Sequence, residues 1–162
     1  IDKIYCSPFI RVLQTIHPFA KTHNIQPSCD YCLAETVTET NFIVKPDMTL
    51  SENQTKEFNV NKFHESLFNK KKLVYPESDK QIEERVNMFC KYLEERYGPS
   101  NTTILIASHM DIVNLCLGYF SKQNINRHKY YAMGKISTVE NNKIVFLNDG
   151  SELDDEVELS SL

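Results

Sequence analysis

In two stretches of the chain, a short apolar run is followed by side chains that can bind an anion. In the first, residues 102–107, which are apolar from Ile104 onward, are followed by Ser108 and His109, and an amphipathic segment over residues 112–120 comes next. This pattern predicts a buried parallel strand that leads into a helix. Ligands of open α/β sheets bind outside the carboxyl ends of the strands, so we expect His109 to face a ligand.

The amino-terminal segment repeats this layout with an arginine. Residues 1–6 are predicted to form a strand and residues 10–23 a helix, joined by a polar turn that contains Ser7. Arg11 then lies in the first helical turn, and its planar guanidinium matches two oxygens of a phosphoryl group. Ser7 either donates a hydrogen bond nearby or caps the helix. Arg11 and His109 together predict a phosphate pocket.

The order of these motifs resembles that of a known family. Ser7-Pro8-x-x-Arg11-x-x-Gln14-Thr15 and Ser108-His109-x-Asp111 are similar to the second and last active-site motifs of the histidine phosphatase superfamily, the phosphoglycerate-mutase-like proteins. Glu77-Ser78 resembles the acidic lead-in to the helix before the histidine strand of that family. Residues 135–139 and 143–149 resemble its closing pair of strands. The resemblance covers most of positions 1–150.

The resemblance implies a fold and a set of roles. The fold would be a three-layer α/β/α arrangement around a mostly parallel sheet. His109 would be catalytic and would bind phosphate together with Arg11 and Ser7. Leu33-Ala34-Glu35 resembles the Leu-x-Glu of the family, which makes Glu35 the candidate general acid, with Glu39 as the rival. No metal ion and no cofactor are implied, because histidine and arginine supply the positive charge.

Two departures from the family leave the function open. Family members carry their nucleophilic histidine in an Arg-His-Gly sequence that ends the first, central strand, and this chain contains no Arg-His-Gly. We expect that strand to lie upstream of residue 1 and to pair beside residues 102–107. Met110 stands where the family usually has glycine, and a side chain there would cost space or backbone strain.

Two functions remain open at this point. One is a phosphomonoester hydrolase with a phosphohistidine intermediate, a mutase being less favoured, which would act on a phosphorylated small molecule or a phosphoprotein. The alternative is an inactive relative that serves as a binding or structural subunit of a larger complex, with protein partners. An intact chain with an upstream Arg-His-Gly would favour the enzyme.

Length and composition indicate the domain organisation, the kinds of partner and the cellular location. At 162 residues the chain is expected to form one domain over residues 1–150, with a polar insertion or lid over residues 36–76 and an acidic tail over residues 151–162. A net charge of −4 argues against nucleic acid as a partner. No apolar run approaches the roughly 20 residues of a membrane helix. Five cysteines, an odd number, indicate a reducing compartment, hence an intracellular and cytoplasmic location.

Several smaller features of the sequence predict local roles or elements. Cys29 and Cys32 have the spacing of half a zinc site or a redox pair, but no second pair completes a site. Asp111 is expected to cap the helix that follows it or to orient His109. Lys70-Lys71-Lys72 either belongs to a solvated loop or lies over the mouth of the phosphate pocket, where it would attract an anionic substrate. The remaining predicted elements are a helix over residues 79–97 and a hairpin of residues 137–140 and 143–147.

Overall fold

The computed structural model describes residues 1–69, 72–128 and 134–146. In chain order the elements are β1 (Lys3–Cys6), α1 (Ile10–Thr22), β2 (Pro27–Cys29), the 3-10 turn η1 (Tyr31–Leu33), α2 (Glu52–Glu57), α3 (Asp79–Tyr97), β3 (Ile104–Ala107), α4 (Met110–Ser121), β4 (Thr138–Glu140) and β5 (Lys143–Phe146). The predicted tail over residues 151–162, and Lys70 and Lys71 of the lysine run, lie outside the described residues.

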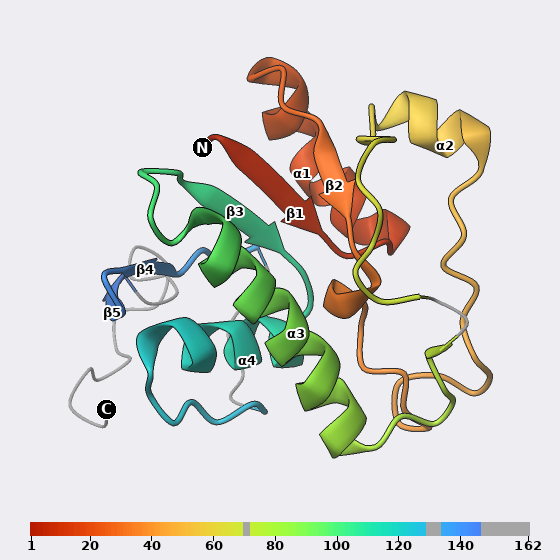
Figure 1. The fold of residues 1–162 in the computed structure, drawn as a ribbon. Helices are drawn as coiled ribbons and strands as arrows, with labels where there is room; N and C mark the ends of the chain where they lie inside the picture. Colours follow the sequence, from red (N-terminus) through yellow and green to blue (C-terminus); the bar gives the residue numbers. More distant parts are fainter. Residues whose placement is uncertain (70–71, 129–133, 147–162) are drawn as a thin grey trace, which may run out of the picture.

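A three-stranded parallel sheet with the order β2-β1-β3 forms the centre. Successive side chains of a strand point to opposite faces, and β1 shows this directly. Ile4 and Cys6 pack into the apolar cluster that contains α1, whereas Tyr5 packs against α3 and α4. Figure 1 shows α3 and α4 on one side of the sheet and α1 on the other. The predicted α/β fold class is confirmed.

Helix α3 has the bounds that the sequence predicted. It begins after Ser78, whose hydroxyl accepts a hydrogen bond from the Gln81 backbone, while the Gln81 side chain accepts from the Ser78 backbone. This capping box satisfies two amide groups that a helix start would otherwise leave without partners. The apolar stripe packs under the sheet, and its members are Ile82, Val86, Phe89, Cys90 and Leu93.

The segment over residues 36–76 supplies part of the core. It contains the short helix α2 and five buried apolar side chains, namely Val37, Met48, Phe58, Val60 and Leu73. Phe58 and Val60 join the cluster around α1, while Val37, Met48 and Leu73 form a cluster of their own with Ala34. The weak periodicity of the segment conceals these contacts, because irregular backbone buries side chains at no fixed spacing.

Strand β3 lies at one edge of the described part of the central sheet. The predicted hairpin is present as β4 and β5, but these strands form a separate antiparallel sheet that packs against α4. All four residues of β3 are partly exposed, whereas Ile4, Tyr5 and Cys6 of β1 are buried. In the described ranges, no helix is both long enough and apolar enough to cross a membrane.

Candidate active site

The four predicted site residues come together at one edge of the sheet. Ser7 follows β1 and His109 follows β3, and the carboxyl ends of these parallel neighbours meet at the same edge. Arg11 lies in the first turn of α1, and Glu35 follows η1. Their side chains are within hydrogen-bond distance of one another through His109. The convergence that the sequence predicted is present.

His109 is buried and has partners on both ring nitrogens. Ser7 Oγ lies 2.8 Å from Nε2, and a carboxylate oxygen of Glu35 lies 3.1 Å from Nδ1. Arg11 Nη2 is also 3.2 Å from Nδ1, but a guanidinium only donates, so it cannot share a hydrogen bond with a protonated Nδ1. A proton on Nδ1 donates to Glu35 whether the ring is neutral or protonated. Nε2 accepts from the Ser7 hydroxyl in the neutral ring and donates to Ser7 Oγ in the protonated ring, so both nitrogens have a partner in either charge state.

Arg11 presents a cation at the open side of the site. Its side chain is 53% exposed, and Nη2 donates to a carboxylate oxygen of Glu35 at 3.3 Å. The guanidinium carbon stands 4.5 Å above the ring centre of Phe9, a cation–π contact. The same ring meets His109 edge-on, with ring centres 5.2 Å apart. Phe9 therefore supports both anion-binding side chains while leaving the arginine accessible.

Glu35 bridges the two positive groups. One carboxylate oxygen faces Arg11 and His109, and the other accepts a hydrogen bond from the Thr36 backbone amide. Burial raises the pKa of this carboxyl, but the hydrogen bond and charge of His109, the Thr36 amide and Arg11 outweigh it, so its pKa lies below the usual value. The carboxylate occupies the place between Arg11 and His109 where another anion would bind.

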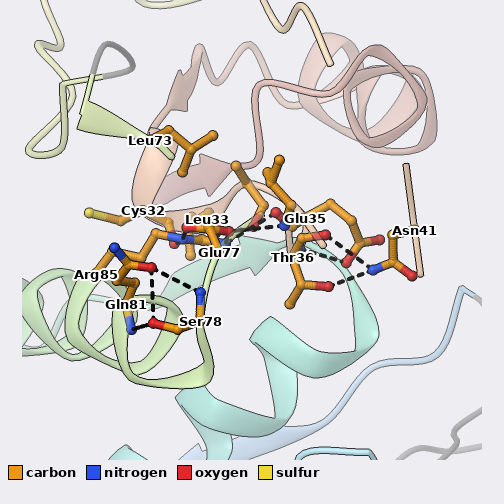
Figure 2. A network of polar contacts seen from close by, with 12 residues as sticks. Cys32, Leu33, Glu35, Thr36, Asn41, Leu73, Glu77, Ser78, Gln81 and Arg85 are labelled. Atoms are coloured by element: carbon orange, nitrogen blue, oxygen red, sulfur yellow. Dashed lines mark hydrogen bonds and ion pairs between the residues drawn. The ribbon is translucent and has the colours of Figure 1, made fainter. Parts of the chain in front are cut away.

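Two further residues hold the backbone near Glu35, namely Arg85, which was not predicted from the sequence, and Ser108, which the sequence showed only as part of the histidine motif. Arg85 of α3 reaches the loop that follows η1, and its guanidinium forms a two-pronged ion pair with Glu77 (Figure 2). Ser108 donates from its hydroxyl to the Leu33 carbonyl at 2.7 Å. Arg85 could have been found from its spacing, since it is three residues after Ile82 and four before Phe89 and so lies on the apolar stripe.

At the start of α4, the prediction that Asp111 caps the helix is wrong, and the backbone strain considered at Met110 is absent. Asp111 does not cap the helix, because His109 occupies the cap position and Asp111 instead faces Arg127 at 3.6 Å and His128 at 3.2 Å. Met110 is the first residue of α4 and has no positive φ, so it carries none of the backbone strain considered for a residue in place of glycine. Its side chain is 38% exposed beside the site.

The remaining candidates lie apart from this cluster. Glu39 is exposed, and within the described residues no hydrogen bond or ion pair joins it to Arg11 or His109. Cys29 lies 3.7 Å from Cys6, sulfur to sulfur, and Cys32 is buried in the core. In the described part of the chain, no three histidine, cysteine or acidic side chains are grouped so that they could hold a metal ion.

Comparison with known proteins agrees with this geometry. A search of curated proteins found no match to this chain. The family model of the histidine phosphatase superfamily (branch 1) matches residues 1–155, which is nearly the whole chain and includes Ser7, Arg11, Glu35 and His109. The chain therefore belongs to branch 1 of the histidine phosphatase superfamily.

Proposed function

We propose that this protein hydrolyses phosphomonoesters through a phosphohistidine intermediate. The observation that carries the proposal is the carboxylate of Glu35 held between Arg11 and His109, because this is an anion site with an acid–base group already inside it. Arg11 would hold two of the three phosphoryl oxygens, and His109 and Ser7 would donate to the third. These fixed donors stabilise the charge that develops during phosphoryl transfer.

The nucleophile in this proposal is a histidine on a strand paired to the free edge of β3. Its ring nitrogen attacks phosphorus as the ester P–O bond breaks, and Glu35 gives its proton to the leaving oxygen. Water then attacks the phosphohistidine, and Glu35 takes the proton as the N–P bond breaks and inorganic phosphate leaves. Two features support the position of the strand: β3 is at the edge of the central sheet in the described residues, and all four of its residues are partly exposed.

Glu35 must be protonated for the first step, although its pKa lies below the usual value without a ligand. A bound phosphoryl dianion replaces the Glu35 carboxylate as the partner of Arg11 and His109, and it places negative charge beside that carboxyl. Both effects favour the neutral acid, because an anion loses its cationic partners and gains a like charge. Substrate binding would therefore prepare Glu35 to donate its proton.

The experiment is to trap the intermediate on the intact protein. A phosphomonoester labelled with ³²P is mixed with the enzyme, and the reaction is quenched in base, in which phosphohistidine survives. We expect label on the protein that is lost in acid, at much lower yield for His109→Ala and at the parent yield for the exposed control Arg96→Ala. An intact protein that neither takes up label nor turns over substrate would instead favour the inactive binding subunit.

A further inference from the structure

The loop that carries Glu35 is held by an unusual number of side-chain hydrogen bonds. Four consecutive backbone carbonyls accept from side chains: those of Cys32, Ala34 and Glu35 from Arg85, and that of Leu33 from Ser108. Loop carbonyls are ordinarily satisfied by water or by neighbouring backbone. The loop is thus fixed from α3 and from the end of β3 at the same time.

Arg85 uses every donor that it has. Nε and Nη2 donate to the two carboxylate oxygens of Glu77 at 2.8 and 3.0 Å, Nη1 donates to Cys32 and Ala34, and Nη2 also donates to the Glu35 carbonyl at 3.1 Å. These contacts account for all five N–H groups of a guanidinium. The Arg85 side chain is fully buried, so water competes for none of them.

Glu77 closes the other end of the same loop. One of its carboxylate oxygens accepts from the Val37 amide at 2.9 Å, and its own amide donates to the Val37 carbonyl at 2.8 Å. Glu77 therefore binds the backbone two residues after Glu35, while Arg85 binds the backbone at Glu35 and before it. Figure 2 shows Glu35 and Thr36 in the same network as Arg85 and Glu77.

We propose that Arg85, held by Glu77, is the positioning residue that fixes the carboxylate of Glu35 in the active site. A general acid must stay within about 0.5 Å of its productive place, and supporting hydrogen bonds are the means to hold it there. Stability alone does not explain the pair, because apolar residues of similar volume often replace a buried ion pair without loss. The inference rests on the proposed role of Glu35 as acid.

The test compares variants of the intact protein by two readouts. Arg85→Lys keeps the buried charge but loses the fork, and Leu93→Ala is the matched control, a core truncation two turns further along α3. The pKa of the Glu35 carboxyl is measured by ¹³C NMR. Turnover is measured on an alkyl phosphate, a poor leaving group, and on p-nitrophenyl phosphate, a good one. Should Arg85→Lys not fold, the double variant Glu77→Gln with Arg85→Met, which buries no charge, takes its place.

In Leu93→Ala we expect the pKa of Glu35 to stay below 4.5, as in the parent. In the Arg85 variant the pKa of Glu35 should rise toward 4.5. The value of kcat on the alkyl phosphate should fall about 10-fold more than kcat on p-nitrophenyl phosphate, and KM should change little. In a Glu35→Gln background the same change should cause no further selective loss. A folded variant with the parental Glu35 pKa overturns the inference. Absence of turnover in the parent refutes the proposed function instead, and the pKa still decides the role of Arg85.

Discussion

Glu35 is the residue on which the proposed chemistry depends most. Its carboxylate is the one acidic group that contacts both Arg11 and His109 among the described residues. Its side chain is 20% exposed, so a leaving group that enters from solvent can reach it. The rival acid, Glu39, is exposed and contacts neither Arg11 nor His109 in the part of the chain that the structure describes. The geometry therefore favours Glu35 for proton transfer.

Replacing Glu35 by glutamine should slow poor leaving groups selectively. An alkoxide must be protonated as it departs, whereas p-nitrophenolate leaves readily without help. We expect kcat on an alkyl phosphate to fall by about 10²-fold or more and kcat on p-nitrophenyl phosphate by less than about 10-fold. Glu39→Gln is the matched control and should leave both rates unchanged. Equal losses on the two substrates in Glu35→Gln would move the acid role to another residue.

At the scale of the elements, buried polar side chains bind the irregular segments of the chain to the strands and helices that carry the site. Asp30, at the end of β2, is an example separate from Arg85. Its carboxylate accepts hydrogen bonds from the backbone amides of Cys32 and Leu67 and the hydroxyl of Ser66, and it pairs with His64. Burial raises the pKa of Asp30, but these partners lower it more, so the net pKa lies below the usual 3.8. This carboxylate fastens the segment over residues 61–68 beside β2.

The substitution Asp30→Asn should destabilise the protein in a pH-dependent way. Hydrogen bonds to a charged group contribute about 1.5 to 3 kcal/mol, and we expect a loss of that size at pH 7. Because the pKa of Asp30 is lower in the folded protein, its contribution is complete well above pH 3.8 and is lost as the pH falls through the folded pKa. The difference from the parent in urea unfolding should therefore narrow in acid. Glu65→Gln, an exposed neighbour, is the control, and a pH-independent difference would contradict the assignment.

The helices and strands could be predicted from the sequence, but the buried polar contacts that hold the loops between them could not. The stripe of α3, the strand before His109 and the hairpin all have a period that marks them. Glu77 was noticed only as an acidic lead-in to that helix, and the position of Arg85 on the apolar stripe indicates burial but does not identify its partner. Their pairing depends on how α3 packs against the loop after η1, and no local pattern encodes that distance. Ser7 and His109 were predicted because each follows a strand end, and Arg11 because it lies in the first turn of the next helix. Glu35 was predicted only from the resemblance of Leu33-Ala34-Glu35 to the family motif.

At the scale of the whole molecule, the open side of β3 is the feature that the proposed function must explain. The carbonyls of Thr103 and Ala107 accept hydrogen bonds from the segment that contains β1. Polar groups of a parallel strand alternate between its two neighbours, so those of Ile104 and Ile106 point to the free edge. Such an edge is a template for another strand, and a pairing strand would bring a histidine to the side of His109.

Hydrogen exchange can detect that strand in the intact protein. If a nucleophile-bearing strand pairs with β3, the amides of Ile104 and Ile106 should be protected about as strongly as those of β1, although no strand in the described residues covers them. The amide of Ala107, on the side of β1, serves as an internal reference. Exchange of Ile104 and Ile106 at the rate of solvent-exposed amides would contradict the placement.

The central claim is that Arg11 and His109 bind the transferring phosphoryl group. The most direct measurement is kcat/KM on a phosphomonoester for Arg11→Ala and His109→Ala in the intact protein, with Arg96→Ala as an exposed control. The claim predicts losses of at least about 10²-fold for both site variants, the size expected when a transition-state donor is removed, and none for the control. Turnover that is unchanged in a folded Arg11→Ala or His109→Ala protein would contradict it.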